Sequence, residues 1–170
     1  MKPVLISIRP KWCYLIASGS KTIEVRRTRP KIETPFKCYI YETKARSDMP
    51  TFVDEDGHVL YTGCGQVIGE FVCDGIDEYS YGYCDGVDID DDTILETAID
   101  REDINIYANG KTLFGWHISN LEIYDKPREL GEFYKFPSNC HRGIQKDNCD
   151  YCFDCQITRP PQSYMFVEEV

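Results

Sequence analysis

Short apolar runs separated by glycine and proline constrain the fold of this chain more than any other feature. Residues 4–8, 22–26, 37–42, 66–73 and 164–167 are rich in β-branched and aromatic side chains and have the length of strands. None of the apolar runs approaches the roughly 20 residues that a membrane-spanning helix requires. The pattern therefore predicts a mainly β protein, which we expect to be soluble, cytoplasmic and without a membrane partner.

Three helices are predicted between the strands. The first is expected to begin at Pro10, which suits a first helical turn, and to end at Gly19 in a left-handed conformation. The other two are expected to begin after aspartate N-caps, Asp92 and Asp100. Their predicted ranges are 11–18, 93–98 and 101–108.

The elements together predict an α+β fold that is mainly β. Further strands are expected at 113–117 and 119–124, and a loop or weak hairpin at 44–63. Many short strands with few helices favour a small, partly closed β-barrel with peripheral helices. The length of 170 residues predicts a single domain, 1–170, with a cysteine-rich insertion at 139–156.

The net charge of −10 conceals a split along the chain. Residues 1–46 carry 11 Lys and Arg against three acids, a net charge of +8, whereas the other 124 residues carry −18. The segment from Asp74 to Asp103 holds 12 acids against one arginine. Clustered basic charge indicates an anion-binding face, and a dense acidic segment repels a polyanion. Nucleic acid is therefore expected to approach the basic N-terminal side. The alternative is that the acidic segment folds over this basic side and mimics a nucleic acid, which would argue against binding of a polyanion.

The strongest local pattern runs from Gly19 to Arg26, with the sequence G-S-K-T-I-E-V-R. A glycine-terminated helix turns directly into a strand there, which leaves Lys21 in the corner. The two-residue period of a strand places Glu24 and Arg26 on one face. Two cations beside a carboxylate can bind a phosphate or polarise a carbonyl, with Glu24 as base or positioning group. The alternative is an ordinary ion pair on an edge strand.

These residues resemble the signature of the ASCH family, in the superfamily of PUA-like barrels. The resemblance rests on Ser7-Ile8-Arg9-Pro10-Lys11-Trp12, followed by Gly19-x-Lys21-x-x-Glu24-x-Arg26. Weaker similarities occur at 39–43, 67–70, 116–119 and 159–163. The resemblance implies a stand-alone bacterial or phage protein with a β-barrel, a cleft at the helix–strand corner and a role in RNA or nucleotide chemistry.

The family also implies roles for individual residues. One branch hydrolyses N4-acetylcytidine with a lysine, a threonine and a strand glutamate, and another is ribonuclease-like. The lysine falls on Lys21 and the strand glutamate on Glu70, whereas the threonine position falls on Glu24, so that hydroxyl is missing. Two cations that offset phosphate charge, and a carboxylate that deprotonates a ribose 2′-hydroxyl, fit phosphodiester binding or cleavage better. The expected catalytic residues are Lys21, Glu24, Arg26 and Glu70.

Basic and aromatic residues around this corner are the expected contacts to RNA. Basic side chains suit the phosphate backbone, and aromatic rings suit stacking on unpaired bases. The aromatic rings can equally pack inside the barrel, and Arg27 and Arg29 can belong to a solvated turn. The expected nucleic-acid-binding residues are Arg9, Lys11, Trp12, Arg27, Arg29, Lys31 and Tyr41.

The nine cysteines are unevenly distributed along the chain. Their odd number and a core of ordinary size favour reduced thiols over a disulfide scaffold. Four of them follow the spacing Cys140-x8-Cys149-x2-Cys152-x2-Cys155. Four thiolates complete a tetrahedral zinc shell, and a metal ion would order this polar insertion. The sequence predicts structural zinc, with an iron–sulfur cluster and unbound thiols as the alternatives.

The predicted function is binding of RNA or a modified nucleoside at the corner, with ribonuclease-like cleavage as its chemistry. Two alternatives are a non-catalytic nucleic-acid-binding module and an amidohydrolase acting on N4-acetylcytidine. The sequence contains no glycine-rich phosphate loop, dinucleotide fingerprint or serine nucleophile elbow. This excludes the classes of nucleotide-fuelled enzymes and serine hydrolases.

Overall fold

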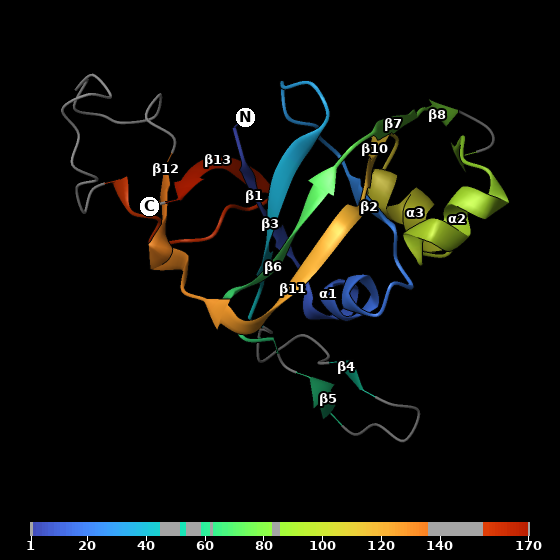
Figure 1. Cartoon of the computed structure of the whole chain (residues 1–170). Helices are drawn as coiled ribbons and strands as arrows, with labels where there is room; N and C mark the ends of the chain where they lie inside the picture. The colour runs from blue at the N-terminus through green and yellow to red at the C-terminus, as the bar shows by residue number, and fades with distance from the viewer. Residues whose placement is uncertain are drawn as a thin grey trace. The chain divides into compact units, whose positions relative to one another are not determined.

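The computed structural model describes residues 2–44, 52–53, 59–61, 63–82, 86–135 and 155–169. Over these ranges the protein is mainly β, with three α-helices and several sheets (Figure 1). The chain divides into two compact units. The single domain expected over 1–170 stays a prediction. The first unit comprises 1–13, 37–70 and 122–170, and the second comprises 14–36 and 71–121.

The first unit is built on a six-stranded sheet with the order β11-β6-β3-β1-β13-β12. Its strand β1 (Val4–Ile8) pairs in parallel with β3 (Phe36–Glu42) and antiparallel with β13 (Tyr164–Glu169). Every residue of β1 is buried, as expected for an interior strand with a mostly apolar sequence. The other strands of the sheet are β6 (Val67–Cys73), β11 (Ser119–Arg128) and β12 (Phe133–Lys135).

The six-stranded sheet is not closed into a barrel, whereas the sequence predicted a small, partly closed one. Strands β11 and β12 are the two ends of the strand order, and no pairing joins them in the described ranges. Closure requires strands that tilt and stagger around a complete ring, whereas β12 has only three residues. The sheet is therefore open, although the α+β class is as predicted.

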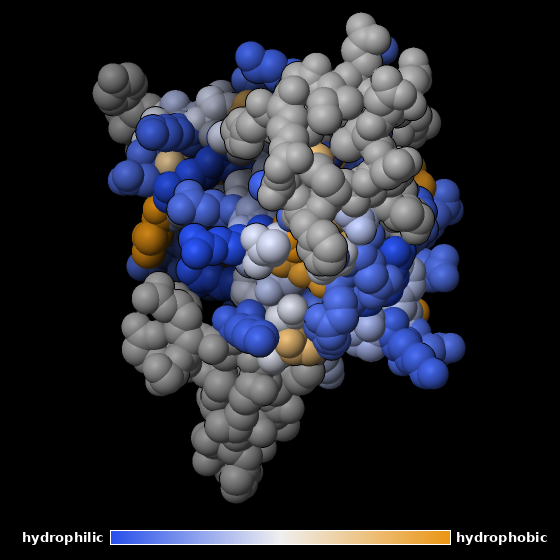
Figure 2. All heavy atoms as spheres, turned by 90° about the vertical axis from the view of Figure 1, so that its left-hand side faces the viewer, coloured by the Kyte–Doolittle hydropathy of each residue, from blue (hydrophilic) through white to orange (hydrophobic). Residues whose placement is uncertain are grey.

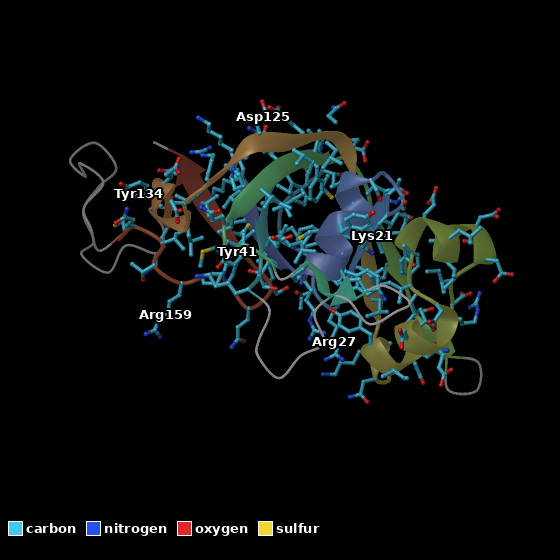
Figure 3. The ribbon with its side chains drawn as sticks, turned by 90° about the horizontal axis from the view of Figure 1, so that it is seen from below. Lys21, Arg27, Tyr41, Asp125, Tyr134 and Arg159 are labelled. Atoms are coloured by element: carbon cyan, nitrogen blue, oxygen red, sulfur yellow. The ribbon has the colours of Figure 1, made fainter. Side chains whose placement is uncertain are left out.

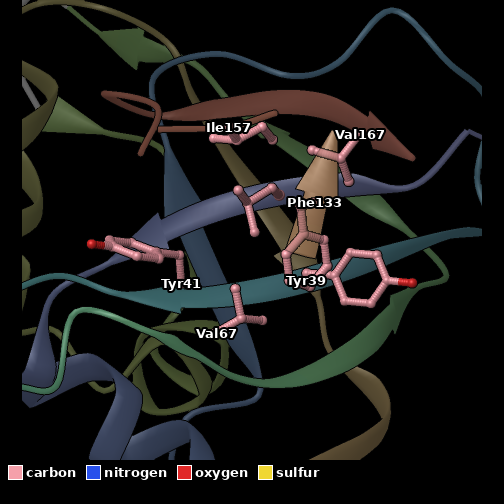
Figure 4. Packing of buried hydrophobic residues seen from close by; sticks show 7 residues of the cluster. Tyr39, Tyr41, Val67, Phe133, Ile157 and Val167 are labelled. Atoms are coloured by element: carbon pink, nitrogen blue, oxygen red, sulfur yellow. The ribbon is translucent and has the colours of Figure 1, made fainter. Parts of the chain in front are cut away.

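Aromatic and aliphatic side chains form the core of the first unit (Figure 4). The rings of Tyr39 and Phe133 lie 5.0 Å apart between centroids, within the usual range of aromatic pairs. Tyr41 belongs to the same cluster and is 6% exposed. The buried residues of the cluster are Leu5, Tyr39, Tyr41, Val67, Phe133, Ile157 and Val167.

Two short elements complete the first unit. The weak hairpin expected over 44–63 is present as β4 (Phe52–Val53) and β5 (Val59–Tyr61). A single 3-10 turn, η1 (Leu130–Glu132), precedes β12. In η1, Leu130 packs against the core cluster of the first unit.

The second unit is built on a three-stranded antiparallel sheet with the order β2-β10-β7. The strands are β2 (Ile23–Arg26), β10 (Leu113–His117) and β7 (Ile76–Tyr79). The sequence did not predict β7, because its exposed Asp77 and Glu78 interrupt the apolar pattern of a strand. A two-stranded pair, β8 (Tyr81–Gly82) and β9 (Gly86–Val87), belongs to the same unit.

Two short helices lie side by side in the second unit, α2 (Asp91–Thr97) and α3 (Arg101–Ala108) (Figure 1). Asp100 caps α3 as predicted. The predicted cap of α2, Asp92, is wrong: the N-cap is Asp90. The Asp90 carboxylate accepts hydrogen bonds from both the amide and the hydroxyl of Thr93, at 2.9 and 2.6 Å, so the helix begins earlier.

No helix in the described part of the chain is long and apolar enough to cross a membrane. Hydrophilic residues cover much of the described surface on the face shown in Figure 2, and hydrophobic residues occur there as small patches. Scattered apolar residues of this kind are normal on a protein surface.

Candidate functional site

The corner that holds Lys21 forms because helix α1 (Pro10–Ala17) ends at a left-handed glycine. Gly19 has φ +75°, a conformation that glycine adopts without steric cost. Its amide donates to the Ile16 carbonyl at 2.9 Å, and the Lys21 amide donates to the Leu15 carbonyl at 3.0 Å. These two bonds turn the chain sharply into β2, as the sequence predicted.

The structure brings together the three charged residues predicted for the corner. Glu24 Oε1 lies 3.0 Å from Arg26 Nε, and Glu24 Oε2 lies 3.5 Å from Lys21 Nζ. The side chains of Lys21, Glu24 and Arg26 are 0%, 7% and 11% exposed. The carboxylate therefore lies between two cations in a nearly closed environment, with Arg26 the most accessible of the three.

The C-terminal end of α2 packs onto this corner. Lys21 Nζ donates to the Thr97 carbonyl at 2.6 Å, and the Thr22 amide donates to the Glu96 carbonyl at 2.9 Å. Carbonyl groups at a helix C-terminus favour a cation. Two backbone carbonyls of the segment from Asp74 to Asp103 thus contact the basic corner, and a polyanion has no direct access to Lys21 Nζ.

Burial lowers the pKa of Lys21 from its ordinary value. The carboxylate of Glu24 opposes this shift by charge attraction and hydrogen bonding, and the positive charge of Arg26 adds to it. Removing an ammonium group from water disfavours its charged form, which is why burial dominates. The Lys21 amine therefore loses its proton more readily than an exposed lysine, a property that suits acid–base chemistry.

Aromatic side chains lie on the same sheet face as the charged pair. In the β2–β10 register, Trp116 is directly opposite Glu24 and Phe114 is opposite Arg26, and directly opposite residues of an antiparallel pair share a face. Trp116 is fully buried and Phe36 packs edge-on against it, with centroids 5.7 Å apart. The charged pair therefore has an apolar surrounding on its own sheet.

Sequence reasoning did not select Thr97 or Trp116 as site residues. Thr97 contributes a backbone carbonyl, which has no sequence signature. The alternation in 113–117 shows that Trp116 and Phe114 share a face, but only the strand register shows that this face is the one with Glu24.

Glu70 lies in the first unit, where both of its carboxylate oxygens are engaged. Oε1 forms an ion pair with Lys37 Nζ at 2.6 Å, and Oε2 accepts a hydrogen bond from the Tyr124 hydroxyl at 2.5 Å. Burial and the contact with Glu70 raise the pKa of Tyr124. These contacts form a hydrogen-bonded network across β3, β6 and β11.

The three basic residues predicted to bind nucleic acid in the second unit have different environments. The guanidinium of Arg27, which is labelled in Figure 3, donates to the Tyr107 carbonyl at the end of α3, with Nε at 2.7 Å. It lies 4.7 Å from the Tyr107 ring centroid. Arg29 and Lys31 are exposed in the loop after β2 and line an open pocket of about 440 Å³. Arg27 thus supports a helix end, whereas Arg29 and Lys31 face solvent.

The remaining predicted contacts to nucleic acid lie in the first unit. Arg9 and Lys11 are exposed, and Lys11 Nζ lies 4.6 Å from the centroid of the half-buried Trp12 ring. Tyr41 is buried in the core cluster. A stacking role on nucleic acid is therefore better suited to Trp12 than to Tyr41.

The predicted zinc ligands fall mostly outside the described residues. Three of them lie outside the described residues: Cys140, Cys149 and Cys152. The fourth, Cys155, is described and buried. Within the described ranges, no three potential metal-ligating side chains come together. A zinc site in this segment stays a prediction.

Solved structures of similar fold cover almost the whole chain. A Tyr-to-Phe variant of ZmASCH from Zymomonas mobilis superposes with a TM-score of 0.58 at 17% identity, covering 99% of this chain and 91% of that chain. The ASCH protein from the same organism gives 0.57 at 18% identity, with 98% and 88% covered, and a Ser-to-Ala variant gives 0.57 at 17%, with 98% and 89% covered. No family model and no curated protein matches the sequence.

Proposed function

Because the chain has an ASCH-type fold, we propose that it binds RNA or a modified nucleoside at the Lys21–Glu24–Arg26 corner. The observation that carries this proposal is a carboxylate held between two cations in a nearly closed environment. Burying charged groups costs free energy that their mutual attraction only partly offsets, and apolar residues would stabilise the same strand as well or better. Clustered ionisable groups with a perturbed lysine are concentrated at functional sites.

The geometry favours a nucleoside-sized group over a long stretch of phosphate backbone. All described acids between Asp74 and Asp103 are exposed, and they repel a polyanion. A nucleoside carries no phosphate charge and is small enough to contact Arg26, the most accessible residue of the corner. For RNA, the same group is a single unpaired base turned out of a loop.

Glu24 and Arg26 have complementary roles in such a site. A carboxylate accepts hydrogen bonds from the exocyclic amine of a base, and a guanidinium donates to its carbonyl oxygen. Both side chains come from one strand and share one sheet face, so their spacing is fixed by the backbone. Arg29 and Lys31, in the exposed loop of the same unit, offer cations to a neighbouring phosphate. The proposal uses residues of the second unit alone; Glu70, which contacts Lys37 and Tyr124 in the first unit, has no role in it.

Equilibrium binding tests the proposal with three ligands: a short single-stranded RNA, cytidine and N4-acetylcytidine. Arg26→Met removes the charge and keeps most of the side-chain length, and we expect it to weaken binding about tenfold or more, the usual effect of losing a charge-assisted hydrogen bond. The matched control is Arg27→Met, since Tyr107 holds that guanidinium at the end of α3; its affinity is expected to match wild type. Thermal unfolding checks that each variant is folded. Equal affinities for wild type and Arg26→Met, or no binding by wild type to any of the three ligands, would refute the proposal.

The lowered pKa of Lys21 favours a second candidate function, hydrolysis of the bound group. An amine that loses its proton more readily than an ordinary lysine suits the role of general base toward a water molecule. That water molecule then takes the place of the hydroxyl that position 24 lacks. For an RNA ligand, Glu24 is the base that takes the proton of a ribose 2′-hydroxyl. Glu24→Gln distinguishes catalysis from binding alone: an enzyme loses turnover of N4-acetylcytidine or RNA and keeps measurable affinity, whereas a binding module shows no turnover in wild type either.

A further inference from the structure

The outward side of α2 and α3 carries apolar side chains that the core does not use. Leu95 in α2 is 73% exposed and Ile106 in α3 is 66% exposed. The inward side of these helices is filled by other residues, with Ile104 and Ala108 fully buried in the core cluster of the second unit. Leu95 and Ile106 therefore contribute little to the stability of the fold.

The two helices repeat the same arrangement of charge around the exposed apolar residue. Leu95 follows Asp91 and Asp92 by four and three positions, and Ile106 follows Glu102 and Asp103 by the same intervals. Residues three and four apart lie on one helix face, and helical side chains lean toward the N-terminus. Each apolar side chain is therefore flanked by two carboxylates, all four of them exposed.

A short connection and an ion pair hold α2 and α3 next to each other. Three residues connect α2 to α3, and an ion pair of 2.7 Å between Asp91 and Arg101 joins their first turns. Arg101 also donates to the Ile89 carbonyl at 2.9 Å. Figure 1 shows the two helices as neighbours in the second unit. We call this outward side the α2–α3 surface; it consists of Asp91, Asp92, Leu95, Glu102, Asp103 and Ile106.

Helix physics explains the acids of the α2–α3 surface but not its apolar residues. Acidic side chains in a first turn interact favourably with the helix dipole. An exposed leucine or isoleucine has no comparable benefit, and apolar surface with a charged rim is typical of interaction sites. Leu95 and Ile106 are therefore the residues that indicate a partner.

The charge of the α2–α3 surface restricts the chemistry of that partner. Nucleic acids and the surfaces of anionic membranes are negatively charged and are repelled. The basic residue of the two helices, Arg101, is engaged by Asp91 and by a backbone carbonyl. A segment with cationic residues on either side of an apolar stripe complements both features, as amphipathic helices do when they bind protein grooves. We propose that the α2–α3 surface docks a cationic amphipathic helix of a partner protein, a function separate from the Lys21–Glu24–Arg26 corner.

Two labelled peptides of identical lysine, leucine and alanine content test this proposal by fluorescence anisotropy. Each has about 18 residues, or five helical turns; one places its leucines on a single helix face, and the other distributes them around the helix. We expect the amphipathic peptide to bind about tenfold tighter or more than the scrambled one, since only it can bury its leucines against Leu95 and Ile106. Raising the salt concentration is expected to weaken its binding.

The double variant Leu95→Ser/Ile106→Ser is expected to weaken binding of the amphipathic peptide about tenfold or more. The matched control is Ile123→Ser, which removes a 40% exposed isoleucine from the first unit and is expected to leave affinity unchanged. Nucleoside binding by the double variant is expected to equal that of wild type, which separates this proposal from the proposed function.

Four outcomes would overturn the proposal. In the first, neither peptide binds. In the second, both peptides bind equally, so that charge alone is responsible. In the third, the double variant binds the amphipathic peptide as tightly as wild type does. In the fourth outcome, sedimentation shows a wild-type dimer that the double variant abolishes, and the α2–α3 surface then belongs to a second copy of this chain.

Discussion

Lys21 is the residue on which the corner depends. Its ammonium group contacts a carboxylate, Glu24, and the last carbonyl of α2, at Thr97. Both partners favour the charged form, yet burial lowers the pKa of Lys21. The charge of the corner therefore depends on pH in a range where an exposed lysine stays protonated.

The stability of the protein is expected to reflect this titration. Between the lowered pKa of Lys21 and its ordinary value of 10.5, the unfolded chain holds a proton that the folded chain releases. Raising the pH through this window therefore favours folding. Chemical denaturation at a series of pH values is expected to show that the unfolding free energy of wild type, minus that of Lys21→Met, increases with pH.

The subtraction removes the titration of groups that do not interact with Lys21. Tyr79 and Tyr124, whose pKa values burial raises, stay protonated in the folded protein at pH values where the unfolded chain ionises. They destabilise both proteins equally at high pH and cancel in the difference. A difference that is flat or falls with pH would show that the pKa of Lys21 is not lowered.

At the scale of the elements, the register of β10 positions the corner. Its residue Gly115 lies opposite Val25, between the partners of Glu24 and Arg26. A Cβ at Gly115 would lie 2.4 Å from the Tyr79 hydroxyl oxygen and 2.9 Å from Ile23 Cγ2. The three strands can pair closely at this point only because the residue has no side chain.

Gly115→Ala is expected to lower the unfolding free energy by about 1–3 kcal/mol, the usual cost of forcing a methyl group into a packed core. The control is Gly82→Ala in β8, where the nearest atom to the added Cβ lies at 3.6 Å and the change is expected to be small. Denaturant titration measures both. Equal stability of the two variants would contradict the close packing of β2, β10 and β7.

The sequence predicted elements whose pattern is local and missed features that depend on pairing. Strand β1 is a mostly apolar run, and β6 is an apolar run interrupted by Gly69 and Glu70. The period of β2 placed Glu24 and Arg26 together. Strand β7 was not predicted, because its exposed acids Asp77 and Glu78 interrupt the apolar pattern. Barrel closure depends on whether the two end strands pair, and the register of Trp116 with Glu24 depends on long-range contacts; no local pattern encodes either feature.

At the scale of the whole molecule, the net charge of −10 limits how RNA can bind. Each phosphate contact to a single strand contributes about −0.7 to the slope of log affinity against log salt concentration. For RNA bound through one base and one or two phosphates, we expect a slope between about −0.7 and −1.4. Nucleoside binding is expected to be insensitive to salt. A much steeper RNA slope, measured by titration at several salt concentrations, would indicate an extended basic face instead.

The cysteine-rich segment is expected to hold a structural zinc ion through Cys140, Cys149, Cys152 and Cys155. Native mass spectrometry of the purified protein is expected to show bound zinc that Cys149→Ser loses, because three thiolates hold the metal less tightly than four. Cys64→Ser lies outside the cluster and is expected to keep the metal. Protein without metal, or with iron and sulfide in place of zinc, would contradict the prediction.

The indole N–H signals of the two tryptophans in a proton–nitrogen NMR spectrum provide the most direct test of ligand binding at the corner. Trp116 lies opposite Glu24 in the sheet of the second unit, and Trp12→Phe assigns its signal. On titration with N4-acetylcytidine, we expect a saturable shift of the Trp116 signal that Arg26→Met abolishes. An unchanged Trp116 signal at saturating ligand, or the same shift in Arg26→Met, would contradict binding at the Lys21–Glu24–Arg26 corner.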